Sequence, residues 1–381
     1  MRLIPLPYTD TRYPAFYLAN TLRTLSVFPQ IPARWLPSIM EMALGEGKTY
    51  RSAAQKVMAK LPDIGRRVVD SLTHSKSEVR IEAAKWLADL KYTEAIAAFN
   101  EALKKETRET VRAAFLTSLE ALGEDIAPRL APAILLAEAK KGLKAKPPSG
   151  LAWFSMDNLP AVRWADGSAV EPEIIQWWIV LATKLKEPAG NALLTRYMSL
   201  LDAPSRQQLG STVLRQFIAQ DARHPSMDEG IAHAKTHAPS RYQQYQDSYN
   251  SAKPEYREWY EVNFAKSQDQ VFEEVRREKM SEYLGSAIGE KGMLALTMHV
   301  PGHEAVSMLQ QYMRDNFQRR SQIEAMLDGL APGNDPLVIQ MMLGLARRYR
   351  TAAVQEKART LVQQIAERNG WTQDQLADRT I

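Results

Sequence analysis

The chain has 381 residues with a formal net charge of +5, and 45% of its residues are hydrophobic and 24% charged. This composition is typical of a globular protein and excludes a disordered or collagen-like chain. The absence of cysteine excludes disulfides, thiolate nucleophiles and cysteine-bound zinc. The longest apolar run, Ile174 to Ala182, is too short to span a bilayer, so we expect a soluble cytoplasmic protein that does not bind a membrane.

The first part of the chain carries an excess of positive charge. Residues 1–150 contain 23 Lys and Arg against 16 Asp and Glu, whereas residues 151–381 contain 26 against 28. A basic segment can attract nucleic acid or an acidic partner, and the alternative is a lysine-rich surface that only keeps the protein solvated. We therefore expect at most weak, non-specific nucleic-acid binding through residues 1–150.

Helical periodicity dominates this first part, and it contains a repeat. Several positions recur at one constant offset along the chain: Val79-Arg80, Leu87 and Leu90 return as Val111-Arg112, Leu119 and Leu122. An apolar helical segment precedes each copy. The pattern resembles the second helix of the HEAT repeat, a helix pair that stacks into a right-handed solenoid. Because one pair cannot bury its apolar face alone, we predict stacked HEAT-like helical repeats over residues 1–141.

The resemblance also implies roles for residues within the repeats. In this family the arginine after the valine pairs with an acidic side chain of the adjoining repeat, which assigns Arg80 and Arg112 to repeat stacking. Second helices line the concave face of such solenoids, so Lys76, Lys85 and Trp86 are the residues that we predict to contact a partner.

Residues 142–171 interrupt the helical pattern. Four lysines between positions 140 and 146 lead into Pro147-Pro148-Ser149-Gly150, which predicts a basic, proline-containing linker. Asp166-Gly167 lies between short apolar runs and is typical of a tight turn, so we expect at most one small β-hairpin, near 159–171. Pro172 suits the first turn of the next helix, and helical segments continue from there.

The sequence offers little for catalysis or metal binding. His233 and His237 share one face of a predicted helix, whereas Pro301-Gly302 separates His299 from His303, and two histidines are too few ligands for zinc. The sequence contains no nucleophile elbow, phosphate-binding glycine loop or dinucleotide fingerprint. We therefore predict no catalytic residues, no metal, no cofactor and a function that is not enzymatic.

A stripe of aromatic residues follows at helical spacing: Tyr242, Tyr245, Tyr249, Tyr256, Tyr260 and Phe264, with Trp259 beside it. With the basic residues between them, these rings could stack on the bases of a single-stranded nucleic acid. The alternative is that they pack helices together while their hydroxyls reach the surface. Nearby carboxylates would repel phosphate, which favours packing.

Signals for helix ends sharpen near the C-terminus. Asn369-Gly370 predicts a left-handed helix stop, and Thr372 with Gln375 has the spacing of a capping box. The run Ala366-Glu367-Arg368-Asn369-Gly370-Trp371-Thr372, followed by Leu376-Ala377-Asp378-Arg379-Thr380, resembles a bacterial domain of unknown function. That domain occurs in very large proteins of the molybdate metabolism regulator (MolR) type. The resemblance covers roughly residues 150–381 and implies a family-specific helical domain over 172–381 that continues beyond Ile381.

These patterns together predict an all-α fold, a HEAT-like α-solenoid followed by a second helical-repeat region. The predicted function is that of a non-enzymatic interaction scaffold, with an unidentified protein partner, inside a larger bacterial regulatory protein. The alternative is a nucleic-acid-binding HEAT-like module in a DNA-repair or ADP-ribose-linked context, because some relatives carry a module that is found beside ADP-ribose polymerases.

Overall fold

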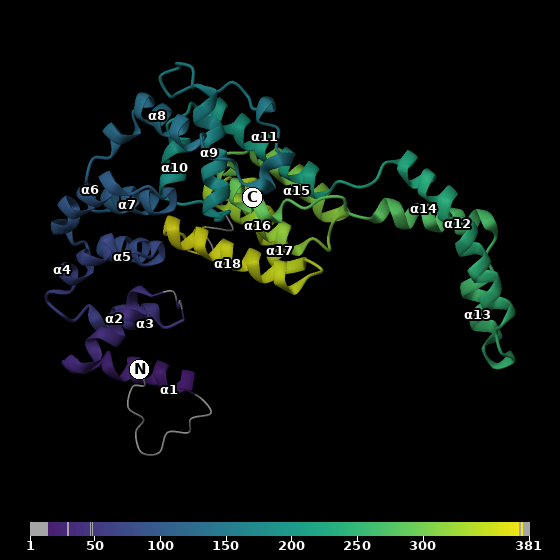
Figure 1. The fold of residues 1–381 in the computed structure, drawn as a ribbon, viewed down its shortest axis with the longest axis horizontal. Helices are drawn as coiled ribbons and strands as arrows, with labels where there is room; N and C mark the ends of the chain where they lie inside the picture. The colour runs from purple at the N-terminus through teal and green to yellow at the C-terminus, as the bar shows by residue number, and fades with distance from the viewer. Residues whose placement is uncertain (1–13, 29, 46, 48, 373–374, 376–381) are drawn as a thin grey trace. The chain divides into compact units, whose positions relative to one another are not determined.

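The computed structural model describes residues 14–28, 30–45, 47, 49–372 and 375. In these residues the chain folds into helices joined by short turns, with isolated β-bridges but no strand (Figure 1). The predicted all-α, helical-repeat fold class is therefore confirmed. The chain divides into two compact units, Met1–Gly142 with Thr195–Tyr197 and Leu143–Leu194 with Met198–Ile381.

The first unit consists of helix pairs. Its helices are α1 (Pro14–Leu25), η1 (Ala33–Trp35), α2 (Leu36–Leu44), α3 (Arg51–Met58), α4 (Ile64–Val69), η2 (Asp70–Thr73), α5 (Ser77–Asp89), η3 (Thr93–Ala95), α6 (Ile96–Lys105), α7 (Glu109–Ala121), η4 (Ala127–Leu130) and α8 (Pro132–Gly142). Helices α5 and α7 start at equivalent positions of the predicted repeat and pack against each other. Helix α6 packs on α7 through the buried rings of Phe99 and Phe115, which meet edge to face with centroids 5.5 Å apart.

The same turn ends both α5 and α7. The N–H of Tyr92 donates to the carbonyl of Leu87 (3.1 Å), and at the equivalent positions of the next repeat the N–H of Glu124 donates to the carbonyl of Leu119 (3.0 Å). Such a six-to-one hydrogen bond requires a left-handed residue just before its donor. Gly123 (φ 88°) fills that position after α7, and Lys91 (φ 53°) fills it after α5. The two repeats therefore share backbone conformation as well as sequence. The turn after α5 has a lysine at the left-handed position, where glycine is the most favourable residue.

Residues 149–171, predicted to belong to a linker, pack into the second unit. The segment includes η5 (Ser149–Trp153) and η6 (Met156–Asn158), and its buried side chains are Leu151, Phe154, Val162, Trp164 and Val170. The predicted tight turn is present, since the N–H of Trp164 donates to the carbonyl of Ser168 (2.8 Å) and Gly167 is left-handed. Its flanks pair in a single isolated bridge, Arg163–Ala169, rather than in strands.

The rest of the second unit is helical, and a buried 3₁₀ segment runs through its core. The helices are α9 (Pro172–Leu185), α10 (Ala192–Ser199), α11 (Ala203–Asp221), α12 (Met227–Asn250), η7 (Pro254–Tyr256), α13 (Arg257–Phe264), α14 (Gln268–Ser281), η8 (Ile288–Thr297), α15 (Gly302–Asp315), α16 (Arg320–Leu330), η9 (Ala331–Gly333), α17 (Pro336–Arg348) and α18 (Ala352–Asn369). Helices α9, α11 and α16 pack around η8. At Gly292 a Cβ would lie 2.1 Å from the carbonyl oxygen of Ala182, so only glycine allows this close approach.

A buried carboxylate joins several of these helices. Asp221, the last residue of α11, is fully buried and accepts hydrogen bonds from the N–H of Ala287 (2.8 Å), from Nε2 of Gln322 (3.2 Å) and from the hydroxyl of Tyr312. Burial, together with this carboxylate, raises the pKa of Tyr312 above its usual value. The network ties α11 to α15, α16 and the segment before η8.

Helices α12 and α14 form an antiparallel hairpin, and with α13 at its far end we call residues 227–281 the arm (Figure 1). The hairpin has a small core of its own, made by Ala234, Ala238, Val271 and Val275. Both long helices begin with a serine capping box, and the chain enters and leaves the arm at one place, where the N–H of Leu284 donates to the carbonyl of Arg223 (2.8 Å). The arm therefore has its own hydrophobic core and its own helix caps.

Candidate interaction surfaces

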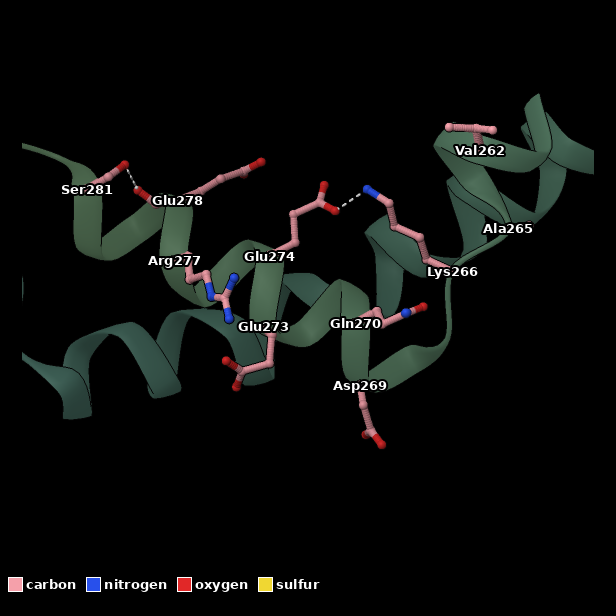
Figure 2. A pocket seen from close by; sticks show the side chains of 10 residues that line it. All are labelled: Val262, Ala265, Lys266, Asp269, Gln270, Glu273, Glu274, Arg277, Glu278 and Ser281. Atoms are coloured by element: carbon pink, nitrogen blue, oxygen red, sulfur yellow. Dashed lines mark hydrogen bonds and ion pairs between the residues drawn. The ribbon is translucent and has the colours of Figure 1, made fainter. Parts of the chain in front are cut away.

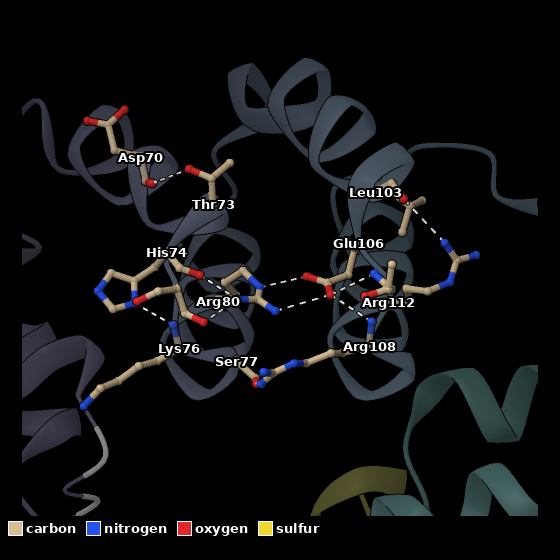
Figure 3. A network of polar contacts seen from close by, with 12 residues as sticks. Asp70, Thr73, His74, Lys76, Ser77, Arg80, Leu103, Glu106, Arg108 and Arg112 are labelled. Atoms are coloured by element: carbon tan, nitrogen blue, oxygen red, sulfur yellow. Dashed lines mark hydrogen bonds and ion pairs between the residues drawn. The ribbon is translucent and has the colours of Figure 1, made fainter. Parts of the chain in front are cut away.

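Two arginines of the first unit join consecutive repeats (Figure 3). Nε of Arg80 lies 2.7 Å from a carboxylate oxygen of Glu106, which follows α6, and Nη1 of Arg80 donates to the carbonyl of His74 (2.6 Å). Arg112 stands at the equivalent position of the next repeat, and its guanidinium lies 4.0 Å from the carboxylate of Glu138 on α8. In both pairs the acid follows its arginine at the same separation along the chain, so the ion pair repeats with the helices.

Glu106 also organises the start of the next helix. Its carboxylate accepts hydrogen bonds from the N–H groups of Thr107 (3.0 Å) and Arg108 (2.9 Å), just before α7. His74 occupies the equivalent position of the preceding repeat, where its Nδ1 accepts from the N–H of Lys76 (3.1 Å), just before α5 (Figure 3). A side chain at this position thus accepts backbone hydrogen bonds that the helix itself cannot satisfy.

The structure corrects the predicted partner surface on α5. Trp86 is only 3% exposed and belongs to the core, so a partner cannot reach its ring. Lys85 is exposed, but Glu78, Glu82 and Asp89 lie on the same face of the helix because these positions are separated by multiples of about 3.6 residues. Lys76 is also exposed, in the turn before α5. Glu82 pairs with Arg51 of α3 (3.1 Å), so the exposed charges here are mixed rather than basic.

Helix α13, at the end of the arm, is held by aromatic packing on one side. Phe264 meets the ring of Tyr245 at 5.2 Å and that of Tyr260 at 5.4 Å, and the hydroxyl of Tyr245 donates to the carboxylate of Glu274. The guanidinium of Arg257 lies 4.4 Å above the ring of Tyr249. These contacts are the helix packing that the sequence favours for the aromatic stripe, with tyrosine oxygens at the surface.

The face of α13 turned away from Phe264 is exposed, and Trp259 lies at its edge, where its ring also packs edge to face on Phe264 (5.7 Å) and Tyr260 (5.1 Å). Trp259 is 57% exposed and Val262 is 76% exposed, and none of the side chains of α13 is buried. Glu255 and Glu258 share this outward face at helical spacing. We call Glu255, Glu258, Trp259 and Val262 the tip. Sequence reasoning missed it because Trp259 and Tyr260 are neighbours that both contact Phe264, and spacing alone does not show which ring stays more exposed.

An open groove of ≈ 910 Å³ runs from the tip along the outer face of α14 (Figure 2). Its lining residues are Val262, Ala265, Lys266, Asp269, Gln270, Glu273, Glu274, Arg277, Glu278 and Ser281. Lys266 pairs with Glu274, and this hydrogen bond raises the pKa of Lys266. Burial acts to raise the pKa of Glu274, but hydrogen bonds from Lys266 and Tyr245 outweigh it, and the pKa is lowered. The lining has four carboxylates against two cations, and Arg276 and Arg241 beside it pair with Glu273 (2.5 Å) and Glu278 (2.8 Å), so the groove is only weakly acidic at neutral pH.

A second groove, of ≈ 420 Å³, lies between α15 and α17. It is lined by His303, Val306, Gln310, Met313, Leu337, Gln340, Met341, Gly344, Leu345 and Arg348. No carboxylate is among these lining residues. This groove is thus more apolar than the one on α14 and has the opposite charge.

Comparison with known proteins shows what part of the first unit is similar to. The fold defines a helical-repeat protein, and residues 45–141 match the family model of HEAT repeats, so this part of the chain consists of HEAT-like repeats. No curated protein and no solved structure matches the chain. Among the described helices, none combines the length and the apolar character that crossing a membrane requires.

Proposed function

We propose that this chain is a non-enzymatic interaction scaffold that binds a protein partner through the tip of the arm, within a larger bacterial regulatory protein of the MolR type. HEAT repeats typically serve as protein-interaction scaffolds. The observation that carries the proposal is α13, a helix without a buried side chain that exposes a tryptophan and a valine. Removing apolar surface from water lowers the free energy by about 25 cal/mol per Å², so a partner that covers these side chains gains binding free energy.

The composition of the tip fits a protein partner better than a nucleic acid. Tryptophan is among the residues that contribute most to binding energy at protein interfaces. The acidic groove on α14 is continuous with the tip through Val262, and its carboxylates would repel phosphate. We therefore expect the partner to present an apolar site next to positive charge.

Affinity capture with quantitative mass spectrometry tests this function. The wild-type chain, Trp259→Asp and the matched control Gln244→Asp, an exposed position on α12, would each serve as tagged bait in lysate of bacteria that also express an untagged copy of the chain. We expect a set of proteins that the wild type and the control retain and that Trp259→Asp loses. If all three baits retain the same proteins, the tip is not the binding surface.

Nucleic-acid binding remains the second candidate function, favoured by the charge excess of residues 1–150 and the exposure of Lys76 and Lys85. The carboxylates on the outer face of α5 oppose it. We expect only sequence-independent binding, with a dissociation constant of roughly 10⁻⁴ to 10⁻⁶ M at physiological salt and a steep loss with added salt. Fluorescence anisotropy with labelled duplex DNA measures it. Sub-micromolar, sequence-selective binding that the double variant Lys76→Glu/Lys85→Glu loses would favour this function over the scaffold.

A further inference from the structure

The groove between α15 and α17 has the surface of a helix-binding site. Val306, Met313, Met341 and Leu345 form its apolar floor, of which Met313, Met341 and Leu345 are largely buried, at most 9% exposed. Methionine side chains are flexible and polarizable, so they adapt to the shape of a bound apolar side chain. Leu337, at the start of α17, extends the apolar surface and is 47% exposed.

Gly344 gives the groove room for a close backbone approach. It lies in the interior of α17, where glycine is about 1 kcal/mol less favourable than alanine. A Cβ at this position would meet nothing within 4 Å, so packing within the chain does not require glycine here. The missing side chain leaves the helix backbone accessible from the groove, as at contacts where two helices approach closely.

Charge limits what can bind in this groove. His303 and Arg348 are its titratable lining residues. Arg314 and Arg347 stand in the last turns of α15 and α17, at the same end as Arg348. An occupant that fits is a short helix with an apolar stripe and carboxylates beside it.

The tip of the arm has that chemistry and that length. Trp259 and Val262 form an outward apolar stripe, with Glu255 and Glu258 beside it. The eight residues of α13 span about 12 Å at 1.5 Å per residue. On the same scale, the groove lining from His303 to Met313 along α15 extends over about 15 Å.

We propose that the tip of one copy of this chain docks into the α15/α17 groove of a second copy. This inference rests on the proposed function, because it names the partner of the tip. Tip and groove are different surfaces, so the contact is heterologous and builds either a closed ring or an open chain. The eight residues of α13 are fewer than the roughly 20–30 residues per side of a standard interface, so the association is weak and concentration-dependent.

Sedimentation velocity of the full chain over a wide concentration range tests the proposal. Wild type is expected to shift from monomer to larger species, whereas Trp259→Asp and Gly344→Leu, which fills the groove, each remain monomeric. An equimolar mixture of the two variants regains association as a heterodimer, because one variant keeps an intact groove and the other an intact tip. The heterodimer does not grow into larger species, because each pair of variants has only one intact tip and one intact groove and these already contact each other.

Controls separate binding from folding. Gly344→Leu melts at the wild-type temperature or above, because leucine favours helix and the position has space. Gln244→Asp associates like the wild type. The proposal is overturned if the wild type stays monomeric at high concentration, if neither variant weakens self-association, or if the mixed variants do not pair. If the wild type is monomeric but its captured proteins still depend on Trp259, the partner of the tip is not a second copy of this chain. In that case the proposed function still holds.

Discussion

The ion pair between Arg80 and Glu106 gives the sharpest test of how the repeats hold together. Its side chains are 11% and 8% exposed. The variant Arg80→Met leaves a nearly buried carboxylate without its guanidinium and removes a donor from the carbonyls of His74 and Ser75. Removing one partner of a buried pair costs about 3–5 kcal/mol. Because Glu106 keeps its two backbone N–H donors, we expect a loss of about 2–3 kcal/mol in unfolding free energy.

The next repeat supplies a matched control within the same chain. Arg112 and Glu138 occupy the equivalent positions, but they lie 4.0 Å apart with side chains 31% and 22% exposed. Looser, solvent-screened pairs contribute about 0–1 kcal/mol. Double-mutant cycles with Arg→Met and Glu→Gln at each pair should therefore give a coupling energy above about 1.5 kcal/mol for the first pair and below about 0.5 kcal/mol for the second.

Hydrogen exchange measured by mass spectrometry is the suitable assay, because a chain with two units need not unfold in a single transition. Peptides from α5 and α7 report the local opening free energy, and urea unfolding followed by circular dichroism gives the global value. A coupling energy below about 0.5 kcal/mol for Arg80 and Glu106, or an effect of Arg80→Met within about 0.5 kcal/mol, would refute the assignment of Arg80 to repeat stacking.

Three further predictions concern other parts of the molecule. Trp86→Ala should lower the unfolding free energy of the first unit by about 3–5 kcal/mol in urea titrations, because it leaves a cavity in the core. An effect below about 1 kcal/mol would contradict the burial of Trp86. Lys91→Gly should raise stability by up to about 1 kcal/mol, since glycine adopts the left-handed conformation without strain, and a lower melting temperature would contradict this. The pKa of Glu274 is lower in the folded arm than in the unfolded chain, where a glutamate has a pKa of about 4.3. The pair of Glu274 with Lys266 therefore stabilises the arm fully at pH values above about 4.3. This stabilisation is lost as the pH falls through the lowered pKa of the folded state. The opening free energies of α12 and α14, obtained from hydrogen exchange after correction for the intrinsic pH dependence of exchange, should therefore fall on acidification in the wild type and change less in Glu274→Gln. Identical pH profiles of the opening free energy would refute the role of the pair.

Local patterns in the sequence were enough to predict much of the fold. The repeat offset, read from Val79 to Val111, correctly places α5 and α7, because each helix repeats the same apolar positions. Pro172 begins α9 and Gly370 ends α18 in the left-handed conformation, as their backbone preferences require. The hydrogen bonds of the predicted capping box between Thr372 and Gln375 are present, while most of the helix that it would open lies outside the described residues.

The interaction surfaces depend on contacts between distant segments, and the sequence did not reveal them. Trp86 follows Val79 and Ala83 at helical spacing, so its phase already indicated burial, and assigning it to a concave face ignored that signal. The acidic partners of Arg80 and Arg112 could have been found by applying the repeat offset to the glutamates. The α15/α17 groove could not have been found from the sequence, because it lies between two helices that are separated along the chain by a third helix, α16.

The closed base of the arm has a consequence for how this chain can change. Residues 223 and 284 are hydrogen-bonded neighbours, the hairpin between them supplies its own core, and the Asp221 network continues beneath the base without any residue of the hairpin. Mutation or recombination can therefore lengthen, shorten or exchange the hairpin without disturbing the body to which it is attached. On the proposed function, chains of this architecture can change their binding specificity by exchanging the hairpin alone, and the same boundary offers protein engineers a site for grafting a binding element.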